Sequence, residues 1–332
     1  MAEVLKPTVL WLDGCFDGFH YAHANAIRQA RKLFVGPVRM LACVHSDEEI
    51  LKNKGPSLFD EQERYAVVAS CRWVDEVVEG APYITDLDTL DKYNVDFLVH
   101  GDDAVVDAMG RDIYAPLKAQ GRYREFRRTE GVSTTSLVQR VLEYPRLRQE
   151  CGYLDRLLEE FVESIPGPFP VVDFGSLSGA MASPFCSLVG AKVYVPGSWD
   201  CFSAGHVEFL RRVKEAVTSD SKVVVGVWSD EEMTGGPPLL TVVERALAVV
   251  QCKYTDAVLW NVPKCTPASR LGFEMVVNRD AYQHEPDSAQ VIEVLMPPLQ
   301  TLSKLQDRVH GRIDAFKERQ RPSHIDQENV TT

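Results

Sequence analysis

The sequence predicts an α/β protein of two tandem domains, each a doubly wound parallel sheet. Three observations predict this class. The chain has 332 residues, enough for two domains at about 100–200 residues each. One pattern of residues occurs in both halves of the chain, and short apolar runs alternate with segments of helical periodicity. Strands that alternate with helices form parallel sheets with right-handed crossovers.

The repeat joins two stretches of the chain that keep a nearly constant separation in sequence. Four pairs of blocks match in order: GCFDGFHYAH (14–23) with GSWDCFSAGH (197–206), SDEE (46–49) with SDEE (229–232), Glu63-Arg64 with Glu244-Arg245, and CRWVDEVV (71–78) with CKYTDAVL (252–259). A repeat of this length indicates a duplicated domain rather than a short solenoid unit.

Each half begins with an apolar strand and continues with a helix. In the first half we expect strands at 8–13, 37–44 and 95–101, with helices that begin near 22 and 61. In the second half we expect strands at 191–196 and 222–228, with helices at 207–217 and 242–252. The strand segments are short, continuous apolar runs, which is typical of parallel strands buried on both faces.

The two halves are separated by a segment of different composition. Residues 163–190 are rich in Pro, Gly and Ser, which predicts a linker that runs over the surface, and residues 151–162 predict a short helix ahead of it. We therefore expect four parts: a first domain at 1–150, the helix and linker at 151–190, a second domain at 191–320, and a disordered tail at 321–332.

Composition excludes several classes of protein. The net charge of −12 argues against nucleic acid as a partner, because such binding needs a basic surface. No apolar run approaches the ~20 residues of a membrane span, and the N-terminus lacks the pattern of a signal peptide. The eight cysteines form no CxxC pair and are expected to be reduced thiols. We expect a cytoplasmic protein.

The first turn after a strand is the expected ligand site. In open α/β sheets, ligands bind beyond the carboxyl ends of the strands, and the free N–H groups of a helix N-terminus favour phosphate. Here that turn is GCFDGFHYAH, in which His20 and His23 can both donate to a bound polyphosphate. Taken alone, two histidines at this spacing are a weak signal, because such residues are also found buried in cores or at metal sites.

The sequence of this turn and two further motifs strengthen its assignment as a ligand site. HYAH (20–23) is similar to the HxGH signature of the nucleotidyltransferase superfamily, and KGP (54–56) and RTEGVSTT (128–135) match its cytidylyltransferase branch. With its tandem layout, the chain resembles the ethanolamine-phosphate cytidylyltransferases. The resemblance is strong over 8–142 and partial over 191–320, and it implies two Rossmann-like nucleotidyltransferase domains.

The resemblance implies the reaction and its partners. The cytidylyl group of CTP would pass to phosphoethanolamine, giving CDP-ethanolamine and pyrophosphate for phosphatidylethanolamine biosynthesis. Mg²⁺ would be carried by the triphosphate, with no protein ligand. No integral membrane association is expected, and any contact with the endoplasmic reticulum would be peripheral. The paired halves would form an intramolecular pseudo-dimer, in a chain that is a monomer or a homodimer.

The resemblance also implies roles for individual residues. The catalytic residues would be His20, His23, Lys54 and Arg128. CTP would be bound by Gly14, Cys15, Phe16, Asp17, His100, Gly101, Asp102, Asp103, Arg128, Thr129, Gly131, Val132, Ser133 and Thr134. The acceptor would be bound by Tyr21, Trp73 and Asp75. The bland alternatives are a solvated loop lysine for Lys54, a turn-capping carboxylate for Asp17, and core packing for the aromatic side chains.

The chain departs from the family pattern in both halves. In the first motif Ala22 replaces the usual glycine, and its methyl group can crowd the phosphates. In the second half Ser203 replaces the first histidine, Gly235 replaces the lysine, and Leu299–Leu302 stands where the arginine–threonine loop would be. We expect this half to be inactive. It would either pack structurally or keep a nucleotide or regulatory site near Asp200 and His206.

Two rival functions remain open from the sequence. A choline-phosphate cytidylyltransferase would use the same chemistry on a trimethylammonium acceptor. Those enzymes usually carry a long, lysine-rich amphipathic membrane helix, and we do not expect the C-terminal residues of this sequence, which have no sustained apolar face, to insert into a membrane. A pseudoenzyme that senses nucleotide or acts as a scaffold would explain Ala22, although the other motif residues of the first half are all present.

Overall fold

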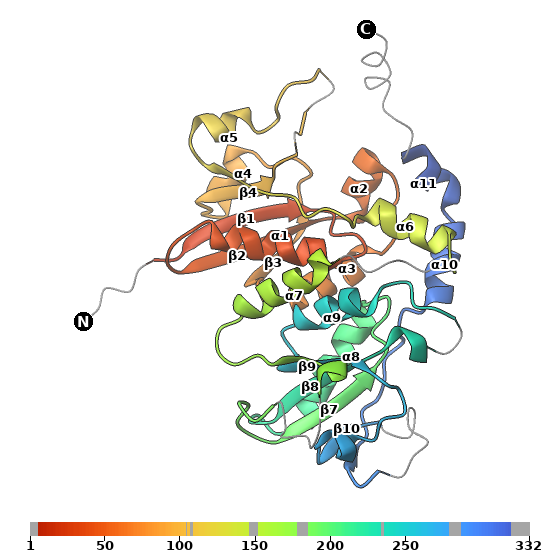
Figure 1. Cartoon of the computed structure of the whole chain (residues 1–332). Coiled ribbons are helices and arrows are strands. Elements are labelled where there is room, and N and C mark those ends of the chain that lie inside the picture. The colour runs from red at the N-terminus through yellow and green to blue at the C-terminus, as the bar shows by residue number, and fades with distance from the viewer. Residues whose placement is uncertain are drawn as a thin grey trace, which may run out of the picture.

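The computed structural model describes residues 6–103, 105–106, 109–145, 152–177, 185–233, 236–278 and 287–319. Figure 1 shows two α/β halves, with the N-terminal half above the C-terminal half. Each half holds one sheet of parallel strands that alternate with helices along the chain, so the predicted fold class is confirmed. The tail expected at 321–332 lies outside the described residues.

The first half contains a five-stranded parallel sheet in the order β3-β2-β1-β4-β5. Its strands are β1 (Thr8–Gly14), β2 (Val38–His45), β3 (Glu76–Ala81), β4 (Phe97–Gly101) and β5 (Tyr123–Phe126). The chain starts in the middle strand and winds outward on both sides, so the direction of winding reverses between β1 and β4. Ligands of doubly wound sheets bind beyond the carboxyl ends of the strands at such a reversal.

Helices cover the first sheet and connect its strands. They are α1 (Tyr21–Lys32), α2 (Asp47–Lys54), α3 (Glu61–Ser70), α4 (Leu87–Lys92), α5 (Ala115–Ala119) and α6 (Thr134–Leu142). In α1 the fully buried side chains Ala24, Ile27 and Ala30 recur every three residues, and this stripe packs the helix on the sheet. The N-terminus of α1 therefore lies at the edge where β1 ends.

The second half repeats this order. Its sheet, β11-β10-β7-β8-β9-β6, is the first sheet with one added edge strand. The strands are β6 (Val171–Asp173), β7 (Lys192–Gly197), β8 (Lys222–Trp228), β9 (Ala257–Val262), β10 (Met275–Val277) and β11 (Gln290–Ile292). The helices are α8 (Ala204–Ala216), α9 (Val242–Val250), α10 (Leu302–His310) and α11 (Ile313–Arg319).

The two halves meet at equivalent residues of the repeat. Cys71 and Cys252 face each other in an antiparallel bridge. The amide of Arg72 donates to the carbonyl of Gln251 at 2.8 Å, and the amide of Lys253 donates to the carbonyl of Ser70 at the same distance. This reciprocal pair of hydrogen bonds gives the halves the relation of two subunits about a pseudo-twofold axis, as in the expected pseudo-dimer.

The helix that ends each half packs against the other half. Arg140 of α6 forms an ion pair with Glu244 of α9, and Arg308 of α10 forms one with Glu63 of α3. Glu63 and Glu244 are equivalent in the repeat, and α6 and α10 also pack on each other. Each half thus packs one helix, α6 or α10, against the other half.

The segment between the halves differs from the expected surface linker. The short helix is present as α7 (Tyr153–Glu163), but it packs between the halves, where Phe161 is fully buried against the ring of Trp73. Residues 171–173 are β6, which pairs with β9, and Phe169 is buried ahead of it. Apolar residues within a Pro- and Gly-rich stretch explain why this part folds into the second half.

No helix in the described part of the chain is both long and apolar enough to cross a lipid bilayer.

Candidate active site

A cavity of about 850 Å³ opens at the edge where β1 and β4 end. The N-termini of α1 and α6, the end of α2 and residue Ala315 of α11 border it. It is lined by these predicted residues: Gly14, Cys15, Phe16, Asp17, His20, His23, Lys54, His100, Gly101, Asp103, Arg128, Thr129, Val132, Ser133 and Thr134. Asp102 and Gly131 line an adjoining surface pocket of about 510 Å³, together with Arg128.

Two stacked histidines form one wall of the cavity. The rings of His20 and His23 lie 3.9 Å apart at an interplanar angle of 19°. His20 caps α1, and its amide donates to Nδ1 of His23 at 3.3 Å. Nδ1 of His23 is therefore an acceptor, and its ring carries the proton on Nε2. Both ring nitrogens of His20 are buried and make no hydrogen bond to the described residues, which marks a place for a ligand.

Burial keeps both histidines neutral. Desolvation, then the charges of Arg128 and Lys54, lower the pKa of His23 to about 3. Desolvation, followed by His23 and two arginines, also lowers the pKa of His20 well below its usual value. At neutral pH both side chains are therefore hydrogen-bond donors without a net charge, and the positive charge of the site comes from Lys54 and Arg128.

Lys54 is the last residue of α2 and lines the cavity on the side of β2 and β3. Its ammonium group lies 5.9 Å from the centre of the Tyr83 ring. The serine cap at Ser46 fixes the start of the helix, accepting from the amide of Glu49 at 3.2 Å. Gly55, with φ +88°, ends it and turns the chain away.

Arg128 lies across the cavity, where two acidic residues hold it. Its guanidinium donates to the carboxylate of Asp103 at 2.9 Å, and its amide donates to Asp102 at 2.9 Å. Both residues predicted at the end of β4 thus touch the loop that follows β5. Gly131 has φ +89°, and a Cβ there would lie 2.5 Å from the hydroxyl of Tyr153, so this loop needs a glycine.

The N-terminus of α6 faces the cavity through a capping box. Ser133 accepts from the amide of Ser136 at 3.1 Å, and Ser136 accepts from the amide of Ser133 at 2.8 Å. The hydroxyl of Thr134 donates to the backbone carbonyl of Asp17 at 2.7 Å, which ties this loop to the histidine loop. Together α1 and α6 direct two helix N-termini at one volume, an arrangement suited to a polyphosphate.

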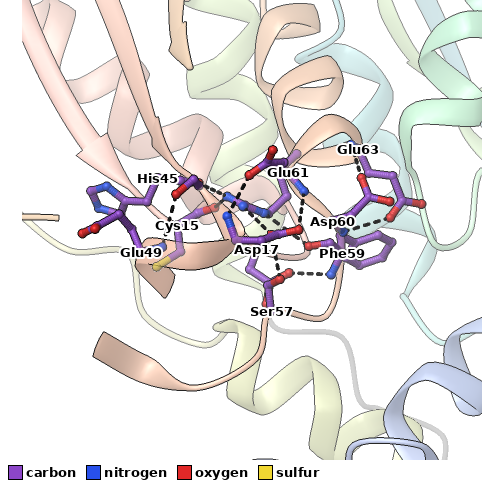
Figure 2. Close-up of polar contacts among 12 residues, drawn as sticks. Cys15, Asp17, His45, Glu49, Ser57, Phe59, Asp60, Glu61 and Glu63 are labelled. Carbon is purple, nitrogen blue, oxygen red and sulfur yellow. Dashed lines mark hydrogen bonds and ion pairs between the residues drawn. The ribbon is translucent and has the colours of Figure 1, made fainter. Parts of the chain in front are cut away.

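Asp17 has a structural position rather than one open to ligand. It is 2% exposed, and its carboxylate accepts from the amides of Leu58 and Phe59 at 2.7 and 2.9 Å. Figure 2 shows this carboxylate directed at the segment that contains Ser57 and Phe59. Of the two readings of Asp17, the turn-capping one fits, because backbone donors occupy both of its oxygens.

Trp73 and Asp75 do not lie at this site, which corrects two of the expected acceptor contacts. Both precede β3, so they lie where the parallel strands begin, at the edge opposite the cavity. Trp73 packs against α7, and the carboxylate of Asp75 accepts from the amide of Met40 at 2.7 Å. Trp73 thus has a packing role, and Asp75 holds the neighbouring strand β2.

Tyr21 is also turned away from the main cavity. Its hydroxyl shares a 2.8 Å hydrogen bond with that of Tyr153, and its ring borders a separate cavity of about 30 Å³ between the halves. Burial and this hydrogen bond raise the pKa of Tyr21 far above its usual range. We assign it a packing role.

A family model described as Cytidylyltransferase-like matches residues 11–140 and again residues 194–317. The chain is 36% identical to the ethanolamine-phosphate cytidylyltransferase of Mus musculus over 295 residues, with 79% of this chain and 72% of that protein covered. It is 39% identical to the enzyme of that name from Dictyostelium discoideum, with 78% and 74% covered. The chain belongs to the ethanolamine-phosphate cytidylyltransferase family.

Similarity to another cytidylyltransferase is confined to a smaller part of the chain. Choline-phosphate cytidylyltransferase 2 of Arabidopsis thaliana is 37% identical over 140 residues, which is 42% of this chain and 46% of that protein. The ethanolamine-phosphate cytidylyltransferases, by contrast, cover both halves.

One cavity residue of this family member was missed by sequence reasoning. Asp13, at the end of β1, lines the cavity and is 8% exposed. Its Oδ2 accepts from the hydroxyl of Thr85 and from the indole of Trp11. An acidic residue at the carboxyl end of the first strand, directly before the glycine of the turn, was a signal that could have identified it.

The second half keeps the scaffold of the site. The carboxylate of Asp200 accepts from the amides of Leu239 and Leu240 at 2.9 and 3.1 Å, as Asp17 does in the first half. His206 caps α8 by accepting from the amide of Ser203 at 3.2 Å, as His23 does for α1. Its ring is buried, and desolvation lowers its pKa to about 4.

The scaffold of the second half, however, is covered by its own chain. A Cβ at Gly205 would lie 2.4 Å from the carbonyl of Pro298 and 3.2 Å from Leu299, so residues 298–299 cross the start of α8. Because Thr301 caps α10 as Ser133 caps α6, Met296 takes the place of Arg128. Gly235, which the sequence comparison aligned with Lys54, lies outside the described residues.

Proposed function

We propose that the first half transfers the cytidylyl group of CTP to phosphoethanolamine, giving CDP-ethanolamine and pyrophosphate. The observation that carries this proposal is the buried histidine pair, with both ring nitrogens of His20 lacking a partner, in a cavity that also contains Lys54 and Arg128. These groups can donate hydrogen bonds to phosphate oxygens. The proposed reaction requires no side chain of the cavity to act as a nucleophile.

The reaction is a displacement at the α-phosphorus of CTP. An oxygen of the acceptor phosphate forms the new bond to this phosphorus, and the bond to the oxygen that bridges to the β-phosphorus breaks. The electron pair of that bond leaves on pyrophosphate. Negative charge on the transferring group is met by Nε2–H of His23, by the His20 ring and by Lys54, so catalysis rests on positioning and charge stabilisation.

When CTP binds, the guanidinium group of Arg128 exchanges the carboxylate of Asp103 for the triphosphate. Its ion pair with Asp103 is exposed, with 61% and 45% of the two side chains accessible, so it contributes only about 0–1 kcal/mol. A triphosphate carries more charge than one carboxylate and can take over the guanidinium. Asp103, whose Oδ1 lies next to the Cα of Gly101 at the end of β4, can then accept from a ribose hydroxyl.

Asp13 is the proposed contact for the ammonium group of phosphoethanolamine. Both of its hydrogen bonds to described residues use Oδ2, and its side chain borders the cavity. An ammonium group donates up to three hydrogen bonds, whereas a trimethylammonium group donates none. A buried carboxylate that is already oriented by Thr85 and Trp11 therefore favours the primary amine.

We propose that Mg²⁺ enters with the nucleotide. Within the described ranges, no group of three His, Cys, Asp or Glu side chains is placed to hold a metal ion. The cavity instead offers donors to phosphate. Bound to triphosphate oxygens, Mg²⁺ would neutralise charge on the leaving pyrophosphate.

The second half is proposed to be inactive. Ser203 cannot replace the ring of His20, Met296 carries no charge, and Pro298 and Leu299 cover the start of α8. These features support a structural role over a nucleotide site near Asp200 and His206.

The test is pyrophosphate release by the full chain with CTP and Mg²⁺, comparing phosphoethanolamine with phosphocholine. We expect a preference for phosphoethanolamine of at least tenfold in kcat/KM. A preference for phosphocholine would keep the chemistry and contradict the acceptor. CTP binding without release of pyrophosphate in the presence of either acceptor would favour a non-catalytic nucleotide sensor.

A further inference from the structure

We propose that α10 and α11, which belong to the second half, form part of the first-half site. In this site Arg308 is a positioning residue for Lys54. This inference rests on the proposed function in so far as it assigns Lys54 a role in the reaction. The structural observation behind this inference is that residues of the second half bind the segment between α2 and α3.

Arg308 grips the start of α3. Its two terminal nitrogens donate to the two carboxylate oxygens of Glu63 at 2.6 and 2.8 Å, a bidentate arrangement that fixes direction as well as distance. Glu63 in turn accepts from the amide of Asp60 as part of the capping box of α3. Figure 2 shows Glu63 and Asp60 joined in this box. Arg308 thus fixes the N-terminus of the helix that follows the Lys54 loop.

The peptide of Leu58 is held from both sides. Its amide donates to Asp17, in the loop that leads to the histidines, at 2.7 Å. Its carbonyl accepts from Arg308 at 3.4 Å and from Arg312 at 3.5 Å, and Arg312 also donates to the carbonyl of Ser57. One side of this clamp therefore comes from the first half and the other from the second.

The clamp lies four residues after Lys54. Only Gly55, Pro56 and Ser57 separate the lysine from Leu58, and both Gly55 and Pro56 line the cavity. A chain this short transmits the position of Leu58 to the end of α2. The reach of the Lys54 ammonium group into the cavity is consequently set, in part, by residues from the other half.

α11 brings the second half to the cavity itself. Ala315 lines the same cavity as Lys54, and Phe316, which is 5% exposed, packs in one apolar cluster with Leu58, Phe59 and Leu305. Figure 1 shows α11 at the same end of the molecule as α2 and α6. The C-terminal helices thus anchor the lysine loop and complete the wall around it.

The Arg308–Glu63 pair is not needed chiefly for stability. Its side chains are 32% and 23% exposed, whereas those of the equivalent pair Arg140–Glu244 are 4% exposed each. Partly exposed pairs contribute little to the free energy of unfolding, and buried pairs are costly to break. A substitution at Arg308 should therefore change the position of the loop without unfolding the chain.

The experiment compares Arg308→Gln and Arg308→Lys with Lys304→Gln, a control on the same helix whose ammonium group binds the carbonyl of Leu299 within the second half. In the full chain we expect R308Q to lower kcat about tenfold, because a catalytic group is misplaced. R308K, which keeps the charge but loses the fork, should fall between R308Q and the parent chain. K304Q should match the parent, and all three should melt within a few degrees of it.

A double-mutant cycle with Lys54→Ala separates positioning from a general effect. If Arg308 acts through Lys54, R308Q changes kcat less than twofold in the K54A background. An equal tenfold loss in both backgrounds, or parental kcat in R308Q, would overturn the inference.

Amide hydrogen exchange provides a readout that does not depend on activity. R308Q should speed exchange at Leu58 and Phe59 at least tenfold, while the amides of β1 keep parental rates. If the parent chain releases no pyrophosphate, the proposed function fails and exchange decides the structural inference alone. Unchanged exchange at residues 57–60 in R308Q would overturn it.

Discussion

Arg140 and Glu244 form a buried ion pair between the two halves, with an Arg140 nitrogen 2.8 and 2.9 Å from the two carboxylate oxygens of Glu244. The equivalent pair on the other side of the pseudo-twofold axis, Arg308–Glu63, is partly exposed. The same type of ion pair thus joins the two halves on each side of the axis, but the two pairs differ in burial. The buried pair lies near the histidines of the cavity, and the exposed pair lies near the segment that follows Lys54.

The two pairs should differ in their contribution to stability. Glu244→Gln leaves the Arg140 charge buried without its partner, which costs about 3–5 kcal/mol. Glu63→Gln, at a partly exposed site, should cost at most about 1 kcal/mol. Urea unfolding of the full chain measures both. Equal losses for the two variants would contradict the assigned difference in burial.

Asp13 should determine recognition of the acceptor amine. Asp13→Asn removes the charge and keeps the size, so we expect the KM for phosphoethanolamine to rise at least tenfold while the KM for CTP changes less than twofold. Asp75→Asn, at the opposite edge of the sheet, is the matched control and should leave both KM values unchanged. Steady-state kinetics with each substrate varied in turn checks this. A larger effect from D75N than from D13N would restore the sequence-based assignment.

Ala22 should weaken CTP binding without preventing the reaction. Its methyl group lies in the cavity wall at the start of α1. Ala22→Gly should lower the KM for CTP severalfold, at a loss of about 0.5–1 kcal/mol of stability from the glycine. Ala24→Gly is the control for the effect of a glycine in this helix, because Ala24 is buried on the same helix but does not line the cavity. An A22G variant whose KM for CTP equals that of the parent would show that the methyl group is harmless.

The buried histidines should make the chain sensitive to acid. Burial holds the pKa of His23 at about 3 and that of His206 at about 4, below the usual 6.5. Between these values and 6.5 the unfolded chain binds protons that the folded chain does not. This part of the free energy of unfolding is therefore complete above pH 6.5 and is lost as the pH falls toward the folded-state pKa.

The melting temperature should accordingly stay level from pH 8 to 7 and fall between pH 6.5 and 5. His206→Asn offers an oxygen in place of Nδ1 as the acceptor for the Ser203 amide and does not titrate. It should reduce proton uptake on unfolding at pH 5.5 by about one proton. A parental uptake in this variant would mean that His206 is not a buried neutral group.

Several features of the site followed from local sequence. The glycine turn and the two histidines were predictable because they lie directly after a strand and at a helix start, where parallel topology brings the ends together. The RTEGVSTT loop was identified by its resemblance to a family motif. The duplication aligned Asp200 with Asp17 and Arg245 with Arg64. These residues form equivalent hydrogen bonds in both halves.

Other features depend on contacts that local sequence does not encode. Trp73 and Asp75 are close to the lysine loop in sequence, but they precede their strand, and strand direction places them at the wrong edge. The clamp on Leu58 joins residues about 250 positions apart, so no motif contains it. The edge strand β6 was hidden in a Pro- and Gly-rich stretch because three residues are too few to show a period.

The central claim is that the chemistry takes place in the first half alone. The most direct test compares His20→Ala with Ser203→Ala, the equivalent position of the second half, in the full chain. The measurement is pyrophosphate release with CTP, Mg²⁺ and phosphoethanolamine. We expect a loss of at least about 100-fold for H20A and less than twofold for S203A. Parental turnover by H20A, or an equal loss in both variants, would contradict it.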